Sequence, residues 1–109
     1  MNIQTYSKGP FCVFRIAEDV GLASDLTVLS RMAEKKIKEG TTCIAIAFTK
    51  NSYLYTRSIA TLLFCFELIK EHGGKLALIK PNKSIIDILK IIDFQKFVMV
   101  CTDEEELGS

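Results

Sequence analysis

The sequence predicts a single α/β domain over residues 1–109, built on a largely parallel or mixed sheet. Two observations lead to this prediction. Short apolar runs, typical of buried strands, alternate along the chain with segments of helical periodicity. A chain of 109 residues with 49% hydrophobic and 25% charged residues is also the size and composition of one ordinary globular domain.

Five strands are expected. Phe11–Ile16 is aromatic and β-branched and follows the turn signal Gly9–Pro10. A shorter strand at Ile3–Tyr6 is expected to pair with it as a hairpin. Cys43–Phe48 is apolar throughout, as in a central strand that is covered on both faces. The two remaining strands are expected at Lys75–Ile79 and Phe97–Val100.

Four helices are expected, three between these strands and one after the last strand. The first begins near Ser24 and ends at Gly40, and the second runs from Thr56 to His72 before Gly73–Gly74. Pro81–Asn82 introduces the third, and Asp103–Leu107 forms a short acidic helix. The core face expected for the second helix consists of Ile59, Leu62, Leu63, Phe66 and Ile69, and that of the third of Ile85, Ile88, Leu89 and Ile92.

The charge balance and the apolar runs exclude two classes of partner. Lys plus Arg total 14 and Asp plus Glu total 13, so no basic excess is available for a phosphate backbone and nucleic acid is not expected as a partner. Ile59–Ile69, the most apolar stretch, is far shorter than the ~20 residues that a membrane-spanning helix needs. The first five residues also lack the basic and apolar regions of a secretory signal.

The cysteines indicate a reduced, cytoplasmic protein. The chain has four cysteines with apolar neighbours and no CxxC pair, namely Cys12, Cys43, Cys65 and Cys101. With His72 as the only histidine, neither a metal site nor a cofactor is expected. Cys65 or Cys101 could act as the nucleophile of a small enzyme, but His72 is the only candidate histidine base, so this is the minority interpretation.

The approach to the second helix carries the candidate binding residues. Tyr53 and Tyr55 flank Leu54, so an extended backbone would place both tyrosines on one side. They either pack against the edge of the domain or form a protein-binding platform together with Lys50, Asn51 and Arg57. Thr56, the first helical residue after the loop, is expected to be the N-cap.

Phe64 and Leu68 form an i,i+4 pair outside the expected core face of the second helix. One interpretation is contact with a neighbouring helix. The other is an exposed apolar patch for a partner protein or for a homodimer.

Three stretches resemble the STAS domain of anti-sigma factor antagonists. These are the strand, loop and hydroxyl-rich helix start of Ile44–Leu63, the helix stop and strand of Gly73–Ile79, and the segment Ile85–Val100 followed by Asp103–Glu105. The likeness covers roughly Phe11–Leu107. It implies a STAS-like fold, which is a small mixed sheet with about four helices packed mainly on one side.

The resemblance also implies a site. In the family a motif of the type Asp-Ser-Ser-Gly opens the second helix, and its first serine is phosphorylated by an anti-sigma kinase. Aligned on Leu62–Leu63, the motif falls on Tyr55–Ser58, so that Thr56 takes the phosphoacceptor position and Ser58 is a weaker candidate. Here Tyr55 replaces the aspartate, Arg57 the second serine and Ser58 the glycine, and Ala47 replaces another usual aspartate.

The function implied is that of a non-enzymatic bacterial regulator of transcription. Its unmodified form would bind an anti-sigma factor or a related regulatory kinase at Thr56, and phosphorylation there would prevent binding. The alternative is a scaffold or oligomerisation module that is never phosphorylated. Its contact surface would consist of Tyr53, Tyr55, Phe64 and Leu68.

Overall fold

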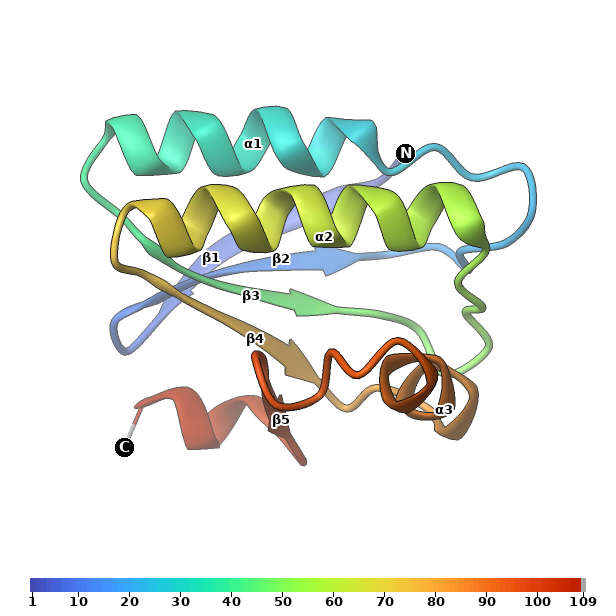
Figure 1. Cartoon of the computed structure of the whole chain (residues 1–109). Coiled ribbons are helices and arrows are strands. Elements are labelled where there is room, and N and C mark those ends of the chain that lie inside the picture. Colours follow the sequence, from blue (N-terminus) through green and yellow to red (C-terminus); the bar gives the residue numbers. More distant parts are fainter. Residues whose placement is uncertain (109) are drawn as a thin grey trace.

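The computed structural model describes residues 1–108, which form one mixed sheet with helices on both faces. The five strands lie in the order β1-β2-β3-β4-β5. β1 is antiparallel to β2, and every other neighbouring pair is parallel (Figure 1). The strands are β1 Ile3–Lys8, β2 Phe11–Ile16, β3 Cys43–Ala47, β4 Lys75–Ile79 and β5 Met99–Cys101.

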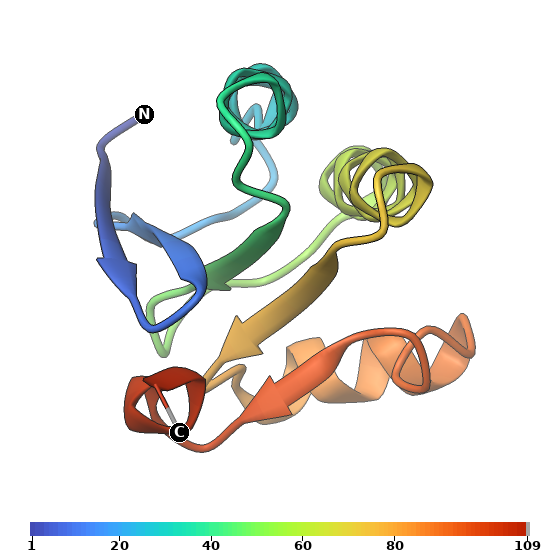
Figure 2. The ribbon, with the colours of Figure 1, turned by 90° about the vertical axis from the view of Figure 1, so that its left-hand side faces the viewer.

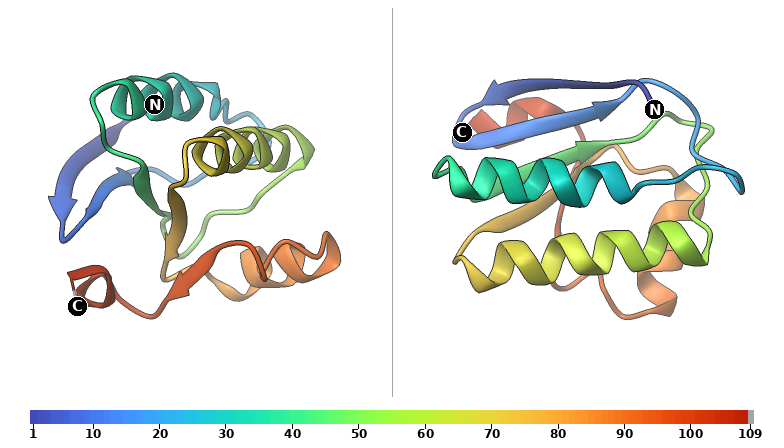
Figure 3. Two further views of the ribbon diagram at one scale, coloured as in Figure 1. Left: turned by 60° about the vertical axis from the view of Figure 1, so that its left-hand side comes forward. Right: turned by 90° about the horizontal axis from the view of Figure 1, so that it is seen from above.

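The helices are distributed unequally over the two faces. α1 Thr27–Lys38 and α2 Thr56–Glu71 run side by side in the same direction over one face, as the view from above shows (Figure 3). The 3₁₀-helix η1, Glu104–Gly108, lies on the opposite face, and α3 Lys83–Ile91 lies beyond the end of β4 (Figure 2). The expected mixed sheet with helices mainly on one side is therefore confirmed, with η1 as the fourth, minor helix.

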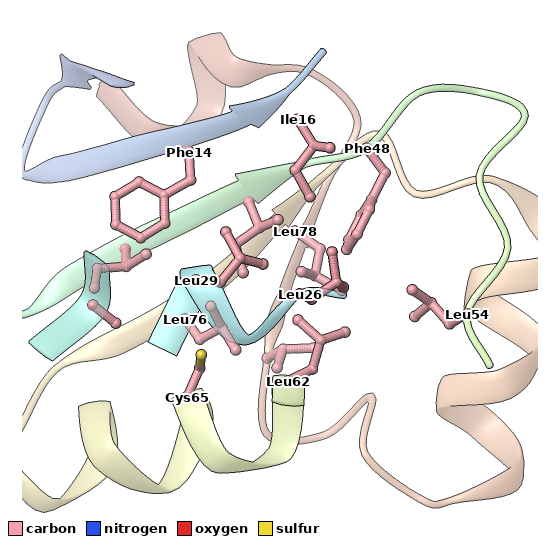
Figure 4. Close-up of a cluster of buried hydrophobic side chains, with 14 of the residues drawn as sticks. Phe14, Ile16, Leu26, Leu29, Phe48, Leu54, Leu62, Cys65, Leu76 and Leu78 are labelled. Carbon is pink, nitrogen blue, oxygen red and sulfur yellow. The ribbon is translucent and has the colours of Figure 1, made fainter. Parts of the chain in front are cut away.

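Side-chain size decides which face receives the long helices. In β3 and β4, the residues that face α1 and α2 are large: Ile44, Ile46, Leu76 and Leu78. Figure 4 shows this layer, in which Leu76 and Leu78 of β4 lie across from Leu62 and Cys65 of α2. Three of the alternate residues are alanines (Ala45, Ala47 and Ala77) and face η1. Burial of the larger layer contributes most of the apolar stabilisation of the domain.

The turn between β1 and β2 is shaped by contact with η1. Gly9 has φ +57°, a left-handed conformation that suits glycine. A Cβ atom at this position would lie 2.5 Å from the carbonyl oxygen of Leu107. Glycine is therefore required here both by the turn and by the close approach of η1.

Several expected boundaries or faces were wrong. α3 ends at Ile91, so Ile92, expected on its core face, follows the helix and is 38% exposed. α1 begins at Thr27, because Ser24 belongs to a turn in which its Oγ accepts a hydrogen bond from the Gly21 amide at 2.9 Å. β5 begins at Met99 instead of Phe97, since the Phe97 amide donates to the Phe94 carbonyl at 3.0 Å and closes a turn. In α2, Leu63 is 39% exposed, and the buried face consists of Ser58, Thr61, Leu62, Cys65 and Ile69.

A polar cluster holds η1 against the hairpin. The Tyr6 hydroxyl donates to the Glu104 carboxylate and accepts from Arg15 Nη2 at 2.9 Å. Arg15 Nη2 also lies 3.2 Å from Glu104 Oε2, and Lys8 Nζ lies 3.0 Å from Glu105 Oε1. The Tyr6 hydroxyl, followed by the Arg15 charge, lowers the pKa of Glu104.

Residues 1–108 include no helix that has both the length and the hydropathy needed to span a bilayer.

The lowered pKa of Glu104 predicts loss of stability in acid. Its contribution is present above the unfolded pKa of about 4.3 and disappears as the pH falls through the lower folded value. Thermal unfolding of Glu104→Gln from pH 7 to pH 3 should show a shallower acid decline than the wild type. The two proteins should differ in their loss of unfolding free energy by less than about 1 kcal/mol, because water reaches both side chains of the Arg15–Glu104 pair. Equal declines in the two proteins would contradict this role.

Candidate functional site

The loop between β3 and α2 presents two tyrosines to solvent. Leu54 is buried at 1% exposure, whereas Tyr53 and Tyr55 are 44% and 40% exposed. The two ring centroids lie 4.8 Å apart, so both tyrosines are on the same side of the extended segment, as predicted. In Figure 4 the Leu54 side chain points from the loop toward the buried hydrophobic cluster. The tyrosines form a small exposed aromatic surface next to the start of α2.

Hydrogen bonds inside the domain fix the shape of this loop. The buried Ser52 Oγ accepts from the Val20 amide at 3.0 Å and lies 2.7 Å from Thr49 Oγ1. The Tyr53 amide donates to the Val20 carbonyl at 2.8 Å. The loop is therefore attached to the segment that leads into α1, and Tyr53 is held at its backbone.

Asn82 joins the same loop to α3. Its Nδ2 donates to the carbonyls of Lys50 at 2.9 Å and Ser52 at 2.7 Å. Its Oδ1 accepts from the Ile85 amide at 2.9 Å and caps α3. The sequence indicated Asn82 as a helix-start residue, but it gave no sign of the bonds to the loop, because their partners lie 30 and 32 residues away along the chain.

Thr56 is exposed at the first residue of α2. The expectation that it is the N-cap was wrong: Tyr55 holds that position in an extended conformation (φ −95°, ψ 172°), and no side chain within residues 1–108 caps the helix. The first turn of α2 also contains no acidic residue. The amides at this end and the helix dipole therefore favour a negative group beside the Thr56 hydroxyl.

Arg57 lines a groove between the first halves of α1 and α2. The groove has a volume of about 400 Å³ and is lined by Thr27, Ser30, Arg57, Ala60, Thr61 and Phe64. Asp25 precedes α1 and has a lowered pKa, first because the Thr27 amide donates to it and also because of the Arg57 and Arg31 charges. Sequence reasoning did not single out Asp25, since the proximity of Arg57 depends on the pairing of α1 with α2.

The remaining candidate residues differ in accessibility. Lys50 and Asn51 are exposed in a turn, and Phe64 is 52% exposed at the groove. Ser58 is only 1% exposed, so its hydroxyl is closed to a kinase or a partner in this structure. Leu68 is partly buried against the main core. Of the predicted Phe64–Leu68 pair, Phe64 is the residue that is largely open to solvent.

The two candidate nucleophiles lie in apolar surroundings. Burial raises the pKa of the Cys65 thiol to about 11. Burial, followed by the Glu106 carboxylate, raises that of Cys101. His72 Nδ1 lies 2.9 Å from the Leu68 carbonyl, as expected for a residue at a helix end. All four cysteines are free thiols, and residues 1–108 hold no group of three or more side chains suited to a metal ion.

The comparisons assign the chain to a family. The family model of the STAS domain matches residues 2–107, so the chain belongs to the STAS domain family. The NMR structure of protein TM1081 is 13% identical with a TM-score of 0.77, over 94% of this chain and 82% of that one. The crystal structure of TM1081 from Thermotoga maritima, provisionally described as an anti-sigma factor antagonist, is 12% identical with a TM-score of 0.76, over 95% and 89%.

A third solved structure has the same fold. The phosphorylated form of the Bacillus cell fate determinant SpoIIAA is 16% identical, with a TM-score of 0.73 over 97% of this chain and 96% of that one. At these identities the likeness establishes the fold. No curated protein matches the sequence.

The double role of Asn82 can be measured. Asn82→Ala should lower the free energy of unfolding by about 2 kcal/mol, of which ~1 comes from the cap and ~1 from the loop bonds. Asn82→Ser keeps a capping oxygen but cannot reach the loop carbonyls, so it should lose about half as much. Urea unfolding of the three proteins checks this. Equal stability of Asn82→Ser and the wild type would contradict the loop anchor.

The raised pKa of Cys65 predicts an inert thiol. Relative to an ordinary thiol of pKa 9.0, a pKa of about 11 reduces the thiolate fraction about 100-fold. Labelling of native protein at pH 8, read by peptide mass spectrometry, should modify the half-buried Cys43 first and Cys65 last. In urea all four thiols should react alike. Fast labelling of Cys65 in the folded protein would revive the nucleophile interpretation.

Proposed function

We propose that this STAS domain is a regulatory protein that binds an anti-sigma factor or a related regulatory kinase in the cytoplasm. The observation that carries the proposal is the exposed Thr56 at an uncapped helix start, beside a loop that internal hydrogen bonds hold in shape. A preformed surface loses little conformational entropy on binding. Tyrosine and arginine, the residue types present here, are also those that anchor many protein interfaces.

The proposed contact surface combines the loop with the exposed side of α2. Tyr53 and Tyr55 supply aromatic area, and Arg57 supplies a positive charge next to the groove. Phe64, at the far end of that groove, adds a large exposed apolar side chain. Together with Lys50 and Asn51, these residues suit a partner that offers apolar side chains and acidic groups.

Phosphorylation of Thr56 would act as a switch on this surface. A phosphate adds about −1.5 to −2 charges at neutral pH. The uncapped amides of α2 and the neighbouring Arg57 guanidinium would stabilise it within the free protein. The modified loop would then repel an acidic partner, and the charged phosphate would have to lose its hydrating water on binding.

A constitutive scaffold is the second candidate. It is favoured by Tyr55 and Ala47, which stand where the family has aspartates beside the acceptor. Ala47 is buried in the layer under η1 and offers no group to orient a hydroxyl or a metal. In this case the tyrosine surface would bind a partner permanently, and Thr56 would serve only as the first residue of the helix.

Binding assays with Thr56 variants separate the two candidates. Thr56→Ala should capture the same anti-sigma factor or kinase as the wild type in a pull-down. Thr56→Glu should bind that partner about tenfold or more weakly, because the added negative charge repels an acidic surface. Intact-mass analysis of the recovered wild type should show one added phosphate, absent from Thr56→Ala. Thr5→Ala, an exposed threonine on β1, is the matched control.

Identical capture by the wild type and both Thr56 variants, with no phosphate, would refute the switch and leave the scaffold. Tyr53→Ala tests whether the tyrosine surface binds at all, and should weaken capture in either case. If neither Tyr53→Ala nor Thr56→Glu changes the partners recovered, the proposed surface is wrong.

A further inference from the structure

The two edges of the sheet differ in character. The exposed residues of β1 are polar and include Gln4, Thr5 and Ser7, with Lys8 at its end. The β5 edge is apolar: Phe97, Met99 and Val100 are 54%, 40% and 45% exposed. No charged residue lies between Lys96 and Asp103. Charged residues normally protect an edge strand from pairing with another chain, and β5 lacks this protection.

The backbone of β5 has hydrogen-bonding groups directed away from the sheet. The Lys80 amide donates to the Cys101 carbonyl at 2.8 Å, and Val100 is in register with Leu78. Since bonding alternates along a strand, Met99 and Cys101 bond to β4. The amide and carbonyl of Val100 therefore point outward, where no strand within residues 1–108 pairs with them.

We propose that the β5 edge is an interface between two copies of this chain. The two β5 strands pair antiparallel about a twofold axis at Val100, so that each Val100 amide donates to the Val100 carbonyl of the other copy. Such an arrangement is isologous and closes as a dimer. The two sheets become one continuous sheet, with α1 and α2 of both copies on the same face.

The side chains of β5 suit this pairing. Val100 of each copy contacts Val100 of the other on the face of α1 and α2, and Met99 lies opposite Cys101 of the other copy on the face of η1. Phe97 contributes from the adjacent turn. Its ring already packs at 5.8 Å from Phe66 and 6.4 Å from Phe94, which holds its exposed part in place.

Charges beside the strand favour the antiparallel arrangement. Lys96 precedes the apolar segment, and the acidic run Asp103–Glu106 follows it. Antiparallel pairing brings Lys96 of each copy to the acidic run of the other, whereas parallel pairing would place like charges together. Within one copy Lys96 is 2.9 Å from Asp93 in an exposed pair, which is easily exchanged. This complementarity within one sequence favours a second copy as the occupant.

The interface is separate from the surface proposed for a regulatory partner. In Figure 1 the start of α2 lies above the sheet, whereas β5 forms its lower edge. A dimer formed through β5 therefore leaves Thr56 of both copies accessible. It also differs from a dimer formed through Phe64, which lies on α2.

Sedimentation velocity of the full chain tests the interface. The wild-type mass should rise with concentration from 12.2 kDa toward twice that value. Val100→Lys, at an exposed position, should remain monomeric, and Lys96→Glu should weaken the dimer by about tenfold. Thr5→Lys on the opposite edge and Phe64→Ala on α2 should dimerise like the wild type. Hydrogen exchange at the Val100 amide should slow as the wild-type concentration rises.

The exchange measurement uses unaltered protein, so it remains decisive if Val100→Lys fails to fold. A wild type that stays at 12.2 kDa throughout the series would overturn the proposal. So would a dimer that persists in folded Val100→Lys or that disappears in Phe64→Ala. Concentration-independent exchange at Val100 would equally exclude this edge.

Discussion

The unequal size of side chains on the two faces of β3 and β4 determines the architecture. Ile44, Ile46, Leu76 and Leu78 form a thick apolar layer, which only long helices such as α1 and α2 can cover. The other face is thin because alanines occupy it, and the short η1 suffices there. The parallel pairing of α1 with α2 over the thick layer brings their first turns together at one end of the sheet, where the candidate site lies.

Most of the fold was predictable because the determining signals are local. The apolar run of β3, the glycines that end α2 and the capping Asn82 each act within a few residues. The buried face of α2 was not predictable in the same way. Its hydrophobicity is high on several sides, and the folded helix buries Ser58 and Thr61 while Leu63 stays partly exposed.

The candidate site was likewise predictable only where its signals are local in the sequence. The shared side of Tyr53 and Tyr55 followed from the alternation of an extended chain, with Leu54 as the buried residue between them. The hydrogen bonds that hold this surface in place could not be predicted from the sequence. Ser52 and Asn82 are small polar residues in turn-rich sequence, where they usually cap helices or face water. Their roles depend on partners at Val20 and Lys50 that only the folded chain brings close.

Asn82 also links two regions into one cooperative unit. The same carboxamide ends the loop network and begins α3, so the loop cannot open without exposing the first turn of α3. Local unfolding of a protein generally occurs in such units and not residue by residue. A molecule that binds the tyrosine surface therefore also suppresses fluctuations of α3, about 30 residues further along the chain. The loop and α3 thus respond to a ligand as a single body, although α2 and β4 separate them along the chain.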